Sequence, residues 1–159
     1  MWQRIQSLYM AVIAILSMVM AFVPVASLME ETSGKTYELK FPGFVAAGEQ
    51  GETILNMWWI YVLLFAIAIV AVVAFFMYKN RTMQQRLLVF DTVLMVGYYV
   101  LFFLGLSSTK SALAELGHET TWHMYFAFCL MLINIVLSVM SIRAIRSDEE
   151  LVRSVDRLR

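Results

Sequence analysis

Charged residues are scarce in this chain, and their scarcity excludes an ordinary soluble domain. They make up 15% of the 159 residues, whereas soluble domains carry about 25%. The deficit lies in four long apolar runs, and hydrophobic residues account for 61% of the whole. We expect a single compact membrane domain, because the loops between the runs are too short to bury a second core.

The chain also lacks paired cysteines and a net charge. Its single cysteine, Cys129, has no partner within the chain, so no disulfide can hold the loops together. We interpret it as a small apolar packing residue. The formal net charge is zero, which gives no electrostatic reason to expect nucleic acid as a partner.

Each apolar run is long enough to cross a bilayer as a helix, which takes about 20 residues. The predicted spans are residues 5–26, 57–78, 87–106 and 122–142. The first could be a cleaved signal peptide, since Arg4 precedes it and Ala26 ends it, but its length favours an uncleaved helix. The fold class predicted for residues 1–146 is therefore an all-α membrane protein, a four-transmembrane-helix bundle.

Basic residues divide unevenly between the loops, which predicts the orientation. Nine of the twelve lie before the first run, between the second and third, or after the fourth: Arg4, Lys79, Arg81, Arg86, Arg143, Arg146, Arg153, Arg157 and Arg159. The loops 27–56 and 107–121 hold only three lysines against seven glutamates. Because cytoplasmic loops carry an excess of Lys and Arg, both termini are predicted to be cytoplasmic and these two loops external.

Small residues on the predicted helices indicate close helix packing. Ala11, Ala14, Ser17 and Ala21 recur at helical spacing on the first helix, and Gly97 and Gly105 lie on the third. Such residues let backbones approach in lipid, where packing replaces the hydrophobic effect.

The loop 27–56 contains a strand pattern. Residues 36–41 alternate polar and apolar between two turn dipeptides. We predict a small external β-hairpin of residues 28–32 against 36–41. Because an isolated hairpin is marginal in water, its apolar face of Tyr37, Leu39 and Phe41 is expected to rest on the bundle, the membrane surface or a partner.

The C-terminal tail, residues 147–159, is predicted to be a cytoplasmic amphipathic helix. Its apolar residues Val152, Val155 and Leu158 lie close to one helical face. Ser147 and Glu150 fit a capping box, which indicates a new helix or a bend at that point. Mixed charge makes simple adhesion to anionic lipid a weak interpretation, so the tail is expected to dock on a protein surface.

Two polar residues inside the predicted spans are candidate functional residues. Asp91 is the only carboxylate in the four runs, and a charged group inside a membrane is costly. We favour a structural ion pair with Arg86, which lies five residues before it, over proton or ion handling. Asn134 is expected to hydrogen-bond between helices, and its predicted depth allows a contact with Asp91.

A metal site is the weakest candidate. Glu115, Glu119 and His123 fall at positions i, i+4 and i+8, and carboxylate and imidazole groups both bind divalent metals. Gly117 interrupts the helical pattern, however, and polar residues near an interface need no metal to explain them. We therefore predict no metal and no cofactor. No complete catalytic or nucleotide-binding motif is present either, so we predict that the protein is not an enzyme.

The two ends of the chain resemble a known family. The segments Trp2–Tyr9 (WQRIQSLY) and Arg143–Arg159 (RAIRSDEELVRSVDRLR) are similar to the signatures of a small four-helix inner-membrane protein family of Bacteroidota, catalogued only as a domain of unknown function. The resemblance covers the whole chain in length and helix order. It implies a bacterial inner-membrane location and supplies no activity, cofactor or site residues.

The sequence leaves two functions open. The first is a non-enzymatic accessory or scaffold subunit of a larger membrane assembly, with lipid and other integral membrane proteins as partners. The motivating feature is a set of apolar surfaces that a chain of this size cannot bury alone. The alternative is a proton- or ion-coupled transporter or channel subunit that uses Asp91 and Asn134. Four helices enclose little pathway unless the protein forms oligomers, which argues against this alternative.

Overall fold

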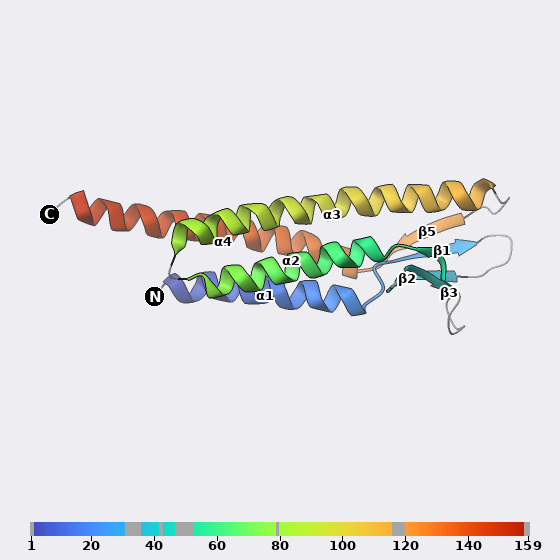
Figure 1. Cartoon of the computed structure of the whole chain (residues 1–159), viewed down its shortest axis with the longest axis horizontal. Coiled ribbons are helices and arrows are strands. Elements are labelled where there is room, and N and C mark those ends of the chain that lie inside the picture. The colour runs from blue at the N-terminus through green and yellow to red at the C-terminus, as the bar shows by residue number, and fades with distance from the viewer. Residues whose placement is uncertain are drawn as a thin grey trace.

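A computed structural model describes residues 2–30, 36–41, 43–46, 53–78, 80–115 and 120–157. Within these ranges it describes the side chains of residues 7–30, 36–41, 43–46, 56–78, 80–115 and 120–148. The described part of the chain is mostly helical and includes one small antiparallel sheet. The helices run side by side, with both termini at one end and the sheet at the other (Figure 1).

The helices correspond to the four apolar runs. They are α1 (Trp2–Phe22), α2 (Trp58–Phe76), α3 (Arg81–Glu115) and α4 (Ala127–Arg157). Among the residues with described side chains, three segments are long and apolar enough to cross a membrane: Trp58–Phe76, Arg81–Glu115 and Ala127–Asp148. In α1 the apolar segment is the shorter Ser7–Phe22. The mostly helical character predicted from hydropathy is confirmed.

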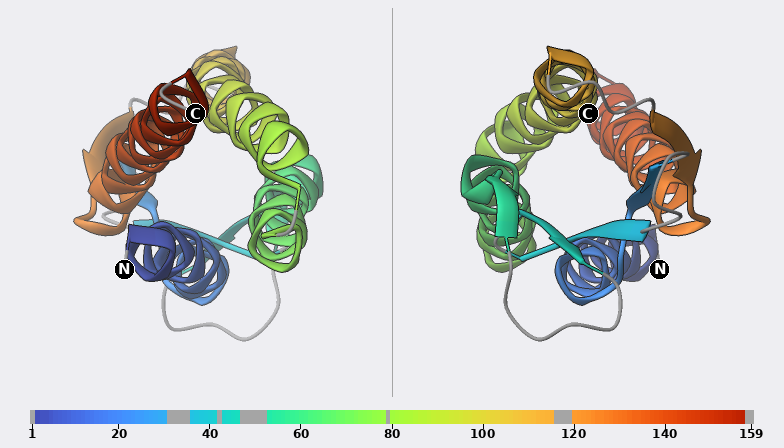
Figure 2. Two further views of the ribbon diagram at one scale, coloured as in Figure 1. Left: turned by 90° about the vertical axis from the view of Figure 1, so that its left-hand side faces the viewer. Right: turned by 90° about the vertical axis from the view of Figure 1, so that its right-hand side faces the viewer.

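The four helices form a ring in which sequence neighbours run antiparallel. α1 packs against α2 and α4, and α3 packs against the same two helices. Figure 2 shows this arrangement along the bundle axis. Each helix places fully buried side chains in one core, including Ile13, Ile67, Met95 and Met131. An aromatic contact joins α3 to α4, where the rings of Tyr99 and Phe128 lie 4.8 Å apart.

The sheet has five strands in the order β4-β3-β2-β1-β5, all antiparallel. They are β1 (Ala26–Glu30), β2 (Thr36–Lys40), β3 (Gly43–Ala46), β4 (Thr53–Asn56) and β5 (Thr120–Met124). The predicted hairpin is present as β1 and β2, with Leu28 opposite Tyr37. The strands β3, β4 and β5 were not predicted. Because β5 pairs with β1, the sheet joins two loops that are far apart in sequence.

The apolar face of the sheet rests on the helices. Leu28, Leu39 and Phe44 are almost completely buried and belong to the same core cluster as the bundle. Tyr37 is half-buried against that cluster, whereas Phe41 is largely exposed and meets the ring of Tyr61 edge-on at 5.5 Å. Of the three supports considered for the hairpin, the structure provides the bundle.

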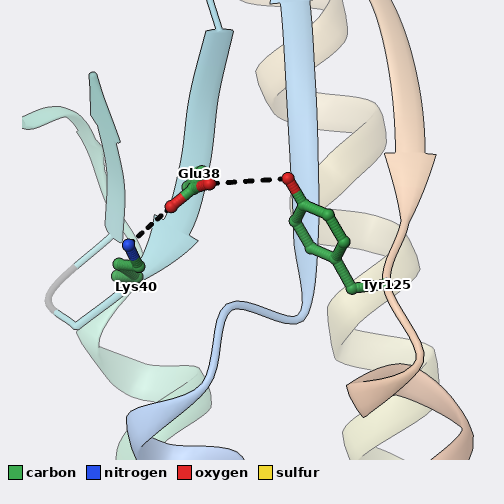
Figure 3. Close-up of polar contacts among 3 residues, drawn as sticks. All are labelled: Glu38, Lys40 and Tyr125. Carbon is green, nitrogen blue, oxygen red and sulfur yellow. Dashed lines mark hydrogen bonds and ion pairs between the residues drawn. The ribbon is translucent and has the colours of Figure 1, made fainter. Parts of the chain in front are cut away.

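A polar contact on the other face ties the sheet to the start of α4. The side chain of Lys40 pairs with Glu38 at 2.5 Å, and the hydroxyl of Tyr125 donates to the second oxygen of Glu38 at 3.5 Å (Figure 3). Glu38 lies in β2, and Tyr125 follows β5 directly. The contact therefore joins the first loop to the connection between β5 and α4.

Two predicted spans extend into strands, for one reason. The fourth span was predicted to begin at Trp122, but this residue lies in β5 and α4 begins at Ala127. The first span was predicted to end at Ala26, which lies in β1. Ala26 and Met124 are paired across these two strands. Hydropathy alone cannot separate an apolar strand from the end of an apolar helix.

The predicted break before the tail is also absent. α4 continues without interruption from Ala127 to Arg157, so no new helix begins at Asp148. Ser147 lies inside this helix and is exposed. A capping serine must have a non-helical backbone. Ser147 has a helical backbone, so it does not cap a helix and is an ordinary surface residue.

Candidate functional site

Asp91 lies on the inward face of α3 and is completely buried. Neither of its carboxylate oxygens has a hydrogen-bond partner among the described residues. The predicted ion pair with Arg86 is not formed, because Arg86 is exposed and points away from the core. Five residues on a helix correspond to about 140° beyond one full turn, which places the two side chains on different faces.

The surroundings of Asp91 follow from the register of the helices. Met10, Ala74, Leu88 and Ile145, one from each helix, form a small buried cluster near the end that carries the termini. One turn closer to the sheet, each helix contributes another fully buried residue: Ile13, Ala71, Asp91 and Ser141. Asp91 therefore shares a layer with one hydroxyl group and two apolar side chains.

α4 presents a polar face to this part of the core. Asn134, Ser138 and Ser141 are all completely buried and are spaced four and three residues apart. The amide of Asn134 donates to the hydroxyl of Ser17 on α1 at 3.1 Å. The hydroxyls of Ser138 and Thr92 lie 2.7 Å apart, which joins α4 to α3. Thr92 is further held by the carbonyl of Leu88 at 2.8 Å.

Several polar atoms in this cluster have no partner. Besides both oxygens of Asp91, these are the side-chain oxygens of Asn134 and Ser141. The contact considered between Asp91 and Asn134 is not a hydrogen bond, and the amide of Asn134 bonds to α1 instead. A buried polar atom without a partner costs about 1–3 kcal/mol. The two oxygens of Asp91 and the hydroxyl of Ser141 share one layer and form a set of acceptors that can bind a water molecule or a small cation, whereas Asn134 lies two turns further along α4.

The polar cluster does not continue through the bundle. Toward the sheet it is followed by a layer of buried apolar and aromatic side chains: Met20, Leu64, Tyr98 and Met131. Toward the termini, a single apolar layer separates Asp91 from Gln84. The buried amide of Gln84 donates to the sulfur of Met10 at 3.3 Å and to the carbonyl of Ala74 at 3.1 Å. The shorter route from Asp91 to the surface is therefore toward the end that carries the termini.

The residues considered for a metal site do not share one helical face. Glu115 is the last residue of α3, His123 lies in β5, and Glu119 is outside the described residues. The helical spacing assumed for them is broken by the strand. No group of three possible metal ligands occurs among the residues whose positions the structure describes.

Sequence reasoning missed most of the buried cluster. It selected Asp91 and Asn134 but treated Ser17 only as a small packing residue, and it passed over Gln84, Thr92, Ser138 and Ser141. The signal was present on α4, because Asn134, Ser138 and Ser141 are spaced so that they fall on one side of an otherwise apolar helix.

A family comparison covers nearly the whole chain. Residues 2–158 match the model described as a domain of unknown function (DUF4293). The chain belongs to this family. The match extends over all four helices and the sheet, so they form one family domain. No curated protein matches the sequence.

Proposed function

We propose that the protein is a non-enzymatic accessory or scaffold subunit of a larger membrane assembly. It would cross the bacterial inner membrane four times, with both termini cytoplasmic. The observation that carries this proposal is the length of α4, which continues to Arg157 and projects beyond the other helices at the end that carries the termini (Figure 1).

The projecting part of α4 has the character of a docking element. At its base, Asp148 pairs with Arg81, the first residue of α3, at 2.9 Å. The nine residues from Glu149 to Arg157 then extend about 13 Å at 1.5 Å per residue. Short isolated helices are marginal in water, so an amphipathic extension of this kind gains stability from a surface that covers Val152 and Val155. Leu158, which the sequence places close to the same face, lies outside the described residues.

We expect the double change Val152→Glu and Val155→Glu to release the partner. Charges on the docking face would have to be desolvated at the interface, which costs several kcal/mol per ion. The four-span core should stay inserted because both changes lie outside it. The measurement is co-purification from native membranes in mild detergent, with the partner identified from the unchanged protein.

The matched control is Arg153→Gln with Arg157→Gln. It changes the net charge by the same two units, on the opposite face of the same helix. The control should retain the partner, and truncation after Arg146 should lose it. Retention of every partner by the Val152/Val155 variant and by the truncation would contradict the proposal.

The proposed orientation makes a separate prediction. In a Cys129→Ala background, single cysteines at Met83 and Glu150 should react with a membrane-impermeant maleimide only after the membrane is opened. A cysteine at Thr36, in β2, should react from outside in intact cells. The reason is the excess of Lys and Arg on the side assigned to the cytoplasm. Labelling of position 83 or 150 in intact cells would overturn the topology.

A second candidate function is supported by the buried cluster. An ionisable residue inside a membrane is a functional hypothesis by default, and Asp91 is fully buried without a partner. Asp91 and Asn134 would then serve a proton- or ion-coupled subunit. The apolar layer of Met20, Leu64 and Met131 closes the cluster toward the sheet, so Asp91 would exchange protons or ions with the cytoplasmic side.

A further inference from the structure

A groove runs between the sheet and the outer half of α3. Its volume is about 340 Å³, and it is lined by Leu28, Phe103, Leu106, Ser107, Lys110 and Trp122. Leu28 and Leu106 are almost completely buried, whereas Phe103 and Trp122 are half-exposed. The rings of these two aromatic residues meet edge-on at 6.4 Å. The buried leucines therefore form the floor of the groove, and the two aromatic rings form its walls.

The groove changes from apolar to charged along its length. Phe103 and Leu106 lie nearer the bundle, and Ser107 and Lys110 lie nearer the end of α3. From Phe103 to Lys110 the helix rises about 10 Å. Lys110 is exposed, and neither ion pair formed among the described side chains involves it. The hydroxyl of Ser107 donates to the carbonyl of Leu104 at 2.9 Å, so its lone pairs can accept a hydrogen bond.

We propose that this groove binds one anionic phospholipid of the outer leaflet. An acyl chain would lie on Leu28, Phe103 and Leu106, and the headgroup phosphate would meet the ammonium of Lys110. The order of the residues matches the order of a lipid, with apolar groups toward the bilayer centre and charge toward its surface. The proposal depends on the membrane orientation given above, and it does not depend on the tail or on Asp91.

A second groove on the other side of α3 provides an internal comparison. It has a volume of about 460 Å³ and is lined by Asn56, Met57, Trp59, Leu101, Leu104, Gly105, Ser108 and Thr109. It contains no basic residue. This groove can hold an acyl chain, but it has no cation to select a charged headgroup. Of the two grooves, only the one that contains Lys110 is therefore expected to prefer anionic lipid.

The test is native mass spectrometry of the full chain in detergent with equal amounts of phosphatidylglycerol and phosphatidylcholine. The unchanged protein should retain one phosphatidylglycerol with about fivefold preference, the contribution of one basic residue near a membrane surface. Lys110→Gln should lower this preference about fivefold. Lys40→Gln removes the same charge from the sheet, at a residue outside the groove, and should keep the preference.

Two results would overturn the proposal. One is equal retention of both lipids by the unchanged protein, and the other is an unaltered preference in Lys110→Gln. Trp122→Glu places a charge beside the proposed chain and should reduce retention of phosphatidylglycerol. An unreduced amount in that variant would also count against the site. Flotation of every variant with vesicles is a separate readout, because loss of flotation would contradict the membrane placement rather than the lipid site.

Discussion

Asp91→Asn is expected to stabilise the helix bundle by about 1–3 kcal/mol, the cost of leaving a buried polar group without a partner. The carboxylate of Asp91 is fully buried, and both oxygens are unpaired. Asparagine keeps the shape, removes the charge and adds two donors. The unpaired hydroxyl oxygen of Ser141 lies in the same layer and can accept from such a donor. The measurement is thermal unfolding of the purified protein in detergent.

This sign is opposite to the one that an ion pair with Arg86 predicts. Breaking a partly buried pair would leave one charge uncompensated and lower the stability. The structure contains no such ion pair, because Arg86 is exposed and the oxygens of Asp91 are unpaired. A lower melting temperature in Asp91→Asn would therefore show that the carboxylate has a partner in the folded protein.

The matched control is Asp148→Asn. Asp148 carries the same side chain but is partly exposed and pairs with Arg81. The loss of that pair should destabilise the protein by less than about 1 kcal/mol. Opposite signs at the two positions would establish that Asp91 is retained against a stability cost.

A residue that is kept although it destabilises the protein points to function, because replacing a functional residue often stabilises the protein. If Asp91 serves ion coupling, flux into vesicles carrying the protein should disappear in Asp91→Asn while the fold remains. If the protein is only a scaffold, unchanged and variant proteins should show no flux and should retain the same partners. The two candidate functions therefore give different results with one variant.

The helices could be predicted from the sequence because their signal is strong and local. A run of about 20 apolar residues has few alternatives to a spanning helix. The sheet was only partly predictable. β1 and β2 are close in sequence and separated by turn residues, whereas β5 pairs with β1 across about 90 residues. The sequence of Thr120–Met124 does not indicate which strand it pairs with. Because Trp122 and Met124 are apolar, the segment was predicted to be the start of a helix.

The candidate site illustrates a similar limit. The sequence places Asp91 and Asn134 inside apolar helices, but which face each presents depends on how the helices pack. Ser138 bonds to Thr92, and Asn134 bonds to Ser17. These pairs lie 46 and 117 residues apart. Serine and threonine are common in apolar helices as small residues, so their participation becomes visible only once the helices are arranged.

Gly105→Val is expected to destabilise the bundle by about 1–3 kcal/mol, the usual effect of inserting atoms into a packed core. A Cβ at Gly105 would lie 2.7 Å from the terminal methyl of Met57 and 3.1 Å from the ring of Trp59. The methionine can move, because its side chain is flexible. The indole is rigid and belongs to the first turn of α2, so the γ-methyls of valine would push α3 away from α2.

Gly97→Val is the control on the same helix. A Cβ at Gly97 would meet nothing within 4 Å. Both changes replace a helical glycine and gain the same few tenths of a kcal/mol in helix propensity. The difference between the two melting temperatures therefore isolates the contact with Met57 and Trp59. Equal effects at the two positions would show that α2 and α3 do not meet closely at Gly105, and the groove lined by Gly105 and Trp59 would then need a different shape.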